Sequence, residues 1–264
     1  MDPFRMRKYP RTPHLEGSRL QPGDEDIEQI PFAEIRGKHL VIEEKVDGAN
    51  SAVSFNADGE LLLQSRGHYL RGGYRERHFD LMKQWGHARR EELYSLLGSK
   101  YIMYGEWVYA KHTVFYDALP HYFLEFDILD RDTGVFLDTP KRHEILKGSS
   151  IVSVPVLGCG TYQAKEELLK LLGASRFVTG SQRENLRNAA ALLGLDPEKA
   201  CNETELSGLM EGLYIKAEED GQVTGRMKYV RAAFRQCMDF SDSHWIDRPI
   251  IPNQLRIPAE DLFR

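Results

Sequence analysis

Short apolar runs separated by turn residues place the strongest constraint on the fold of this chain. Three such runs lie within residues 39–64, with turn signals at Asp47-Gly48 and Asp58-Gly59. Runs of this length, rich in branched and aromatic residues, predict strands, and Ala57-Asp58-Gly59 is expected to form a hairpin turn. A second hairpin is predicted at 212–234, around Asp220-Gly221. We therefore expect antiparallel sheets.

Helical segments alternate with these hairpins. In residues 76–97 apolar side chains recur near the helical period, with an interruption near Gly86. Residues 139–146 predict a short helix with Thr139 as its N-cap and Pro140 at its first position. Further strands are expected at 101–110 and 122–130, and helices at 163–194 with breaks at Gly173 and Gly180. The pattern predicts an α+β fold in which antiparallel sheets are flanked by helices.

The length of 264 residues suits one large domain or two small ones, and no clear linker or repeat divides the chain. We expect a single domain over residues 1–264, with an extended arm at about 1–31 and a helical insertion at about 163–208. The last 30 residues, roughly, have too little strand pattern for an appended OB barrel.

Composition excludes several classes of protein. The chain is 41% hydrophobic and 28% charged, which is typical of a soluble globular protein, and no apolar run is long enough to span a membrane. The N-terminus lacks the apolar core of a secretory signal. Cys159, Cys201 and Cys237 are widely spaced and odd in number, which favours a reducing, cytoplasmic compartment and argues against a zinc site.

The net charge of −5 argues mildly against a nucleic-acid partner, but the positive charges are clustered. One cluster contains Arg66, His68, Arg71, Arg75, Arg77 and His78; the other contains Arg226, Lys228, Arg231 and Arg235. Each cluster is either a set of solvated loops or a basic surface beside an active site.

Lys45 is the first candidate for chemistry, because it ends an apolar strand just before a tight turn. Deprotonating an ordinary lysine at pH 7 costs about 4.6 kcal/mol. A nucleophilic lysine therefore needs burial or a nearby cation to lower its pKa, and the neighbouring carboxylates would act in the opposite direction. Strand alternation places Glu43 on the same side as Lys45, and Gly48 would allow a close approach of a ligand.

Six short motifs occur in an order that resembles the covalent nucleotidyltransferase superfamily of polynucleotide ligases and mRNA-capping enzymes. They are KVDGAN at 45–50, SRG at 65–67, GEW at 105–107, FLEFDI at 123–128, EGLYIK at 211–216 and RMK at 226–228. The resemblance implies a nucleotidyltransferase fold, similar to ATP-grasp proteins. The first motif ends in Asn50. RNA ligase 2-like proteins carry Asn at this position, whereas DNA ligases and capping enzymes usually carry Arg, so the chain resembles the RNA ligase 2-like branch.

The resemblance also implies roles at the matching positions. Lys45 would attack the α-phosphorus of ATP and hold AMP as a phosphoramidate, and Glu43 would contact the adenine edge. Asn50 and Arg66 would act on phosphates, chiefly after the lysine has been adenylylated. Glu106 would bind the ribose, although a solvent-facing strand glutamate is the simpler interpretation.

Phe126 would stack on adenine, but Tyr122, Leu124, Phe126 and Ile128 also form a core-facing alternation that explains it by packing alone. Glu211 is the expected ligand of Mg²⁺ or Mn²⁺. Lys216, Arg226 and Lys228 would bind phosphates. Arg226 departs from the lysine usual in this branch, so proton donation to pyrophosphate would fall to Lys228 or Lys216.

The function implied is an ATP-dependent RNA ligase that joins 3′-OH and 5′-phosphate ends in RNA repair. A DNA ligase or capping-type enzyme and a non-catalytic RNA-binding module remain alternatives. An end-healing kinase or phosphatase and a homodimer are conceivable partners. Near the C-terminus, Trp245 is expected to anchor the tail by burial, and together with His244 it could instead stack on a nucleotide.

Overall fold

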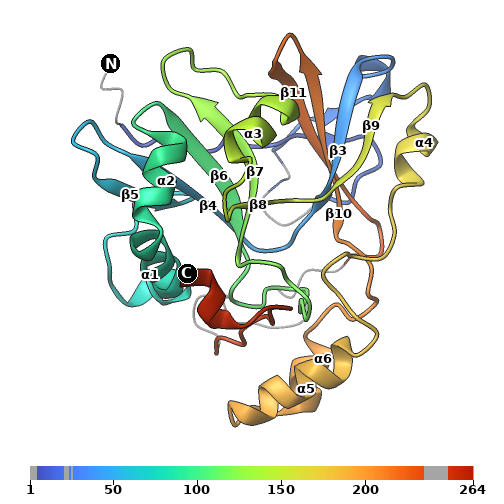
Figure 1. Cartoon of the computed structure of the whole chain (residues 1–264). Helices are drawn as coiled ribbons and strands as arrows, with labels where there is room; N and C mark the ends of the chain where they lie inside the picture. The colour runs from blue at the N-terminus through green and yellow to red at the C-terminus, as the bar shows by residue number, and fades with distance from the viewer. Residues whose placement is uncertain (1–4, 21–23, 25, 235–248, 264) are drawn as a thin grey trace.

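The structure is a computed structural model that describes residues 5–20, 24, 26–234 and 249–263. His244 and Trp245 lie outside the described residues. Two sheets lie beside each other, and α1 (Asp80–Ala88) and α2 (Arg90–Leu97) cover the outer side of one of them (Figure 1). The architecture is α+β, as the sequence predicts.

The first sheet, called the β3 sheet here, has the strand order β2-β1-β11-β10-β3-β9. Its strands are β1 (His14–Leu15), β2 (Gln29–Ile30), β3 (His39–Lys45), β9 (Val156–Thr161), β10 (Gly212–Glu219) and β11 (Gln222–Val230). The predicted hairpin of β10 and β11 is present, and Asp220 and Gly221 at its turn have φ angles of 51° and 81°. Strands β1, β2 and β9 were not predicted.

The second sheet, called the β4 sheet, has the order β5-β4-β6-β7-β8. Its strands are β4 (Ala49–Phe55), β5 (Leu61–Ser65), β6 (Tyr101–Trp107), β7 (Phe123–Asp130) and β8 (Val152–Ser153). The short connection of residues 46–48 joins β3 to β4, so one turn links the two sheets directly after Lys45.

The remaining helices are short. They are α3 (Thr139–Leu146), α4 (Lys165–Leu169), α5 (Gln182–Leu192), α6 (Pro197–Asn202) and the 3-10 helices Phe32–Glu34, Tyr74–Phe79 and Ala259–Phe263. Helices α5 and α6 pack on each other and project away from the sheets (Figure 1). The predicted helical stretch at 163–194 is therefore interrupted over residues 170–181, more widely than breaks at Gly173 and Gly180 alone would require.

Two predicted details of the helices are wrong. The interruption in 76–97 falls at Arg89, whereas Gly86 lies within α1, where an added Cβ would come within 3.0 Å of Leu63. The N-cap of α3 is Asp138, whose carboxylate accepts the Lys141 N–H at 3.0 Å. Sequence reasoning missed this cap because Thr139 is also a good capping residue; its hydroxyl instead donates to Glu218.

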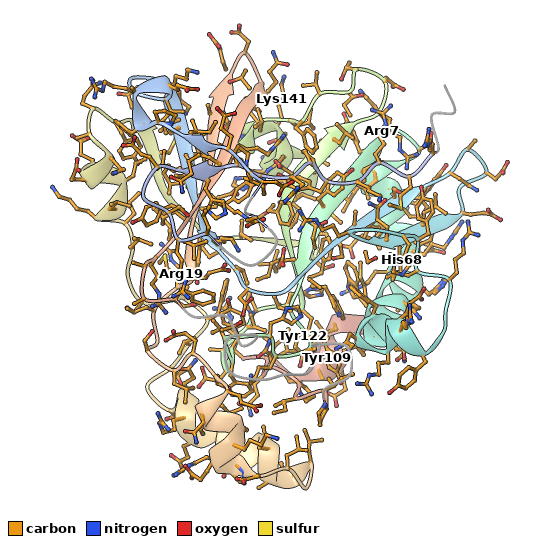
Figure 2. All side chains as sticks on the ribbon, turned by 180° about the vertical axis from the view of Figure 1, so that it is seen from behind. Arg7, Arg19, His68, Tyr109, Tyr122 and Lys141 are labelled. Atoms are coloured by element: carbon orange, nitrogen blue, oxygen red, sulfur yellow. The ribbon has the colours of Figure 1, made fainter. Side chains whose placement is uncertain are left out.

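The N-terminal segment crosses both sheets on the side opposite to the view of Figure 1. The carbonyl of Arg7 accepts hydrogen bonds from Gln64 and Tyr104 of the β4 sheet, and Arg19 bonds to Val230 and Ala232 beside the β3 sheet. Figure 2 shows the two arginines at opposite ends of this crossing. The sequence predicted an extended arm, but it did not predict that the arm adds strands to a sheet.

Strand alternation divides the β3 sheet into an apolar and a polar face. Leu40 and Ile42 of β3 pack with Leu213 and Ile215 of β10 on the outer face of the β3 sheet. The opposite face presents Glu43, Lys45 and Lys216 toward the β4 sheet. The interior between the sheets is therefore rich in charge, which burial tolerates only when the charges are paired. No helix among the described residues is long and apolar enough to cross a bilayer.

Arg142 of α3 reaches into this interior and is fully buried. Its guanidinium lies 2.9 Å from Glu43, 3.5 Å from Glu125 and 3.7 Å from Asp127. These carboxylates, which outweigh the lowering effect of burial, raise the pKa of Arg142. Removing this arginine would leave three buried carboxylates with less compensation.

We predict that Arg142→Met lowers the free energy of unfolding by about 3–5 kcal/mol, because it removes one side of a buried ion network. Urea unfolding followed by circular dichroism measures this. Arg187→Met is the matched control, because Arg187 pairs with Glu198 on the surface and should cost at most about 1 kcal/mol. Equal losses in the two variants would contradict a structural role for the buried arginine.

Candidate active site

Lys45 ends β3 at the boundary between the two sheets. Its side chain is 20% exposed, and its Nζ lies 2.7 Å from the Glu211 carboxylate, which is 2% exposed. Glu211 directly precedes β10, where Gly212 pairs with Lys45. An added Cβ at Gly212 would lie 1.9 Å from the Tyr229 carbonyl, so the close packing of β10 on β11 requires a glycine there.

The charges around Lys45 favour its protonated form. Burial lowers the pKa of Lys45, but the carboxylates of Glu211, Glu106 and Asp47 outweigh burial and raise it above the ordinary value. The sequence predicted that local carboxylates would act in this direction. Lys45 is therefore an ammonium group while Glu211 is its partner, and it could act as a nucleophile only after that partner is engaged elsewhere.

Glu106 and Asn50 lie opposite each other on β6 and β4. Burial raises the pKa of Glu106 to about 8, and Lys45 only partly offsets this. The buried side-chain oxygen of Asn50 has no hydrogen-bond partner among the described residues. On the other side of β4, Ser51 pairs with Ser65 of β5, and Arg66 comes next in the chain. Arg66 is exposed, and its charge lowers the pKa of Glu106. The three predicted residues thus form one row beside Lys45.

The turn after Lys45 is held in place by hydrogen bonds to Asp47 and by close packing around Gly48. Asp47 accepts hydrogen bonds from the N–H groups of Thr113 and Val114 at 2.7 and 2.8 Å. Gly48 leaves no room for a side chain, because an added Cβ would lie 2.9 Å from Glu106 Cγ and 2.7 Å from Val108. The Asp-Gly pair therefore holds Lys45 and Glu106 close together, a packing role that the sequence did not indicate.

Lys228 of β11 faces the same interior and bonds to the carboxylate of Asp24. Asp24 also lies 2.9 Å from Nε2 of His14, which is fully buried and whose Nδ1 contacts Ser18 at 2.7 Å. Burial lowers the pKa of Lys228, and the positive charge of Lys45 lowers it further. The hydrogen bond to Asp24 raises this pKa, but not enough to offset both effects. The N-terminal segment thus supplies an acid and a histidine to the site, which sequence reasoning missed because no motif marks them.

Three other predicted residues, Glu43, Lys216 and Arg226, belong to the buried ion network. Lys216 lies 2.9 Å from Glu43 and 3.2 Å from Asp127, and Arg226 lies 3.6 Å from Asp127. The Arg226 guanidinium also stacks 4.1 Å above the ring of Phe136. Each would have to exchange these partners to contact a nucleotide, so their nucleotide-binding role remains a prediction.

Phe126 is the extra residue of a β-bulge between β6 and β7. Tyr104 pairs with Asp127 and Gly105 with Glu125, so Phe126 has no partner across the ladder. The bulge takes Phe126 out of the core-facing alternation, and its half-buried ring packs against Tyr9 and Tyr214 at 5.1 and 6.2 Å between centroids. It also turns Asp127 toward Lys216, whereas a regular strand would separate them.

The described residues contain no group of three or more His, Cys, Asp or Glu side chains arranged to hold a metal ion. The donor set is the Glu211 carboxylate, with Glu106 and Asp47 near enough to influence Lys45. One or two carboxylates supplemented by water and substrate phosphates are the usual ligands of Mg²⁺. The residues present therefore fit a divalent ion that binds together with a triphosphate.

Most of this chain matches a known protein family. A family model described as RNA ligase matches residues 38–230, which contain Lys45, Glu106, Glu211 and Lys228. The chain belongs to the RNA ligase family. A search of the curated proteins finds no match to it.

Solved structures of an RNA ligase from Naegleria gruberi share the fold. A mutant with ATP and Mn is 18% identical, with a TM-score of 0.52 over 86% of this chain and 57% of that one. A second mutant with ATP and Mn and a mutant in the apo form are each 18% identical, with TM-scores of 0.50. These two alignments cover 85% of this chain and 56% and 55% of those chains, so this chain spans little more than half of the ligase it resembles.

The raised pKa of Glu106 predicts a pH-dependent stability. Between pH 4.5 and pH 8 the folded protein retains a proton that the unfolded chain has lost, so the ionising carboxyl group destabilises the fold as pH rises. Glu106→Gln lacks this titration. We expect the free energy of unfolding of Glu106→Gln, relative to that of wild type, to increase by at most about 1.4 kcal/mol per pH unit from pH 5 to pH 8.

Urea unfolding of the nucleotide-free proteins at several pH values measures the difference. The control is Glu144→Gln, which removes an exposed glutamate and should follow the wild-type profile. Parallel pH profiles for Glu106→Gln and wild type would show that the carboxyl group is not held neutral.

Proposed function

We propose that this protein is an ATP-dependent RNA ligase of the RNA ligase 2-like branch, which seals 3′-OH and 5′-phosphate ends through a lysyl-AMP intermediate. The observation that supports it most is the placement of Lys45. Its amine lies at the boundary between the sheets beside Glu211, Glu106 and Lys228, within the segment that matches the RNA ligase family. Asn50, in the row beside it, supports the choice of branch.

In the first step Lys45 attacks the α-phosphorus of ATP. A P–N bond forms, the bond from that phosphorus to the bridging oxygen breaks, and pyrophosphate leaves. Lys45 must first lose a proton to water, which reaches its partly exposed side chain, and Glu211 opposes that loss as long as it remains the partner of the ammonium. When Glu211 turns its carboxylate toward another cation, burial dominates and lowers the pKa of Lys45.

A divalent ion held by Glu211, Mg²⁺ or Mn²⁺, would supply positive charge beside the triphosphate. Lys228 would bind the phosphates, and its exchange of Asp24 for a phosphate oxygen keeps it paired throughout. Because burial already lowers its pKa, Lys228 is also the better placed of the two lysines to protonate the leaving pyrophosphate: Lys216 is buried between Glu43 and Asp127.

The later steps use the same row of residues. The 5′-phosphate of RNA attacks the phosphorus of lysyl-AMP, which frees Lys45 and forms an RNA-adenylylate. The 3′-OH then attacks the 5′-phosphate and AMP leaves. Asn50 and Arg66 present an amide and a guanidinium in the row beside Lys45, and both groups can donate to phosphate oxygens, so we assign them to these steps.

We predict that Lys45→Ala abolishes the AMP adduct, because no other amine of the site is placed on the turn between the sheets. Labelled ATP and a denaturing gel detect the adduct, and labelled GTP tests a capping-type preference. Lys45→Arg is the sharper variant, since it retains a cation beside Glu211 but stays protonated and should also form no adduct. Lys147→Ala, at an exposed lysine, should react like wild type; an adduct on Lys45→Arg would contradict the assignment.

We predict a different pattern for Asn50→Ala. Sealing of a pre-adenylylated RNA should slow about ten- to a hundredfold, the usual loss for a hydrogen bond to a charged group, while lysine adenylylation changes little. The two rates are measured separately on the same preparation. Equal losses in both reactions would show that Asn50 serves the first step as much as the later ones.

A further inference from the structure

The loop of residues 66–77 concentrates positive charge on a chain whose net charge is −5. It contains four arginines and one acid, Glu76. The guanidinium groups of Arg71 and Arg75 are exposed and have no ion pair among the described residues. Phosphate backbones bind to clustered arginines of this kind, because each contact releases condensed counterions.

Glu76, the acid of the loop, does not neutralise this surface. It is buried, accepts the N–H groups of Arg71 and Gly72 at 3.1 and 2.7 Å, and lies 3.1 Å from Lys83. These bonds lower its pKa against the effect of burial. Glu76 therefore orders the backbone from the inside and leaves the arginine side chains directed outward.

Tyr74 is the most exposed aromatic residue of the described chain, with 71% of its surface accessible. The Arg77 guanidinium lies 5.1 Å from the centre of its ring and donates to its hydroxyl at 3.2 Å. An exposed aromatic ring that is held in place by an arginine provides a stacking surface for an unpaired base. Gly73 before it has a φ of 116°, which few other residues adopt, so the ring projects from a defined turn.

The loop begins beside the candidate active site, and its other end is fixed to the same sheet. It starts at Arg66, beside Asn50 and Glu106, and runs past His68, which Figure 2 labels next to β5. Its far end is fixed by Trp107, whose indole N–H donates to the carbonyl of His78 at 2.8 Å. Trp107 follows Glu106 on β6, but its ring lies on the opposite, apolar face of the sheet, so it is the Arg66 end of the loop that would lead bound chain toward Lys45.

We propose that Tyr74, Arg71 and Arg75 form a platform that binds an unpaired segment of the RNA substrate, with a base on the ring and phosphates on the arginines. This inference rests on the proposed function for the identity of the substrate. A single exposed ring set among arginines offers little apolar surface for a lipid bilayer, and it suits one stacked base well.

Fluorescence anisotropy with a labelled single-stranded RNA, in the absence of ATP, tests the platform. Tyr74→Ala should weaken binding about tenfold, whereas Tyr74→Phe retains the ring and should bind like wild type. The double variant Arg71→Ala/Arg75→Ala should lower the slope of log affinity against log salt by about 1.4, the value for two single-strand phosphate contacts. Arg36→Ala/Lys38→Ala removes two exposed cations elsewhere and should leave both quantities unchanged.

The same variants are tested for AMP adduct formation and for binding to phosphatidylserine vesicles. Adduct formation should stay at the wild-type level, because none of these side chains belongs to the candidate active site. Wild-type RNA affinity in the tyrosine and arginine variants, or no RNA binding by any protein, would overturn the platform. A selective loss of vesicle binding would also overturn it. Absence of the adduct in the wild type would refute the ligase instead, and the anisotropy result would stand separately.

Discussion

The ion pair of Lys45 and Glu211 is the interaction on which this account depends. It joins the last residue of β3 to the residue before β10, and it favours the protonated form of the amine that directly precedes the turn between the sheets. In the proposed reaction the same carboxylate, which holds the lysine charged, would also hold the divalent ion. A single change of partner by Glu211 would therefore bind the metal and release the nucleophile together, which couples the two events.

This coupling requires a charged interior, and the fold accommodates it in an unusual way. The apolar cores lie mainly on the outer faces of the sheets, while the space between them holds Glu43, Asp127, Arg142 and Lys216 in one buried network. Burial would raise the pKa of Asp127, but the three cations around it keep that pKa below its ordinary value. The network stays ionised, and its directional contacts join the sheets beside an apolar cluster that contains Tyr9, Tyr104, Phe126 and Tyr214.

Much of this was predictable from the sequence. The hairpins, the α+β class and the grouping of Lys45, Glu106, Asn50 and Glu211 follow from strand patterns and from six ordered motifs. Sequence patterns could not predict a local irregularity in a strand or a contact between distant segments. A β-bulge moved Phe126 and Asp127 out of register, and alternation assumes that no bulge occurs. Asp24, His14 and Arg142 come from distant segments, and only tertiary packing brings them to Lys228 and Glu43.

The most direct test is to map the site of modification in the wild-type protein. The protein is incubated with ATP and magnesium, digested, and its peptides are sequenced by mass spectrometry. The account predicts one AMP, attached to the side-chain nitrogen of Lys45, and none when magnesium is omitted. AMP on another residue, or no AMP under conditions in which the protein is folded and binds ATP, would contradict it.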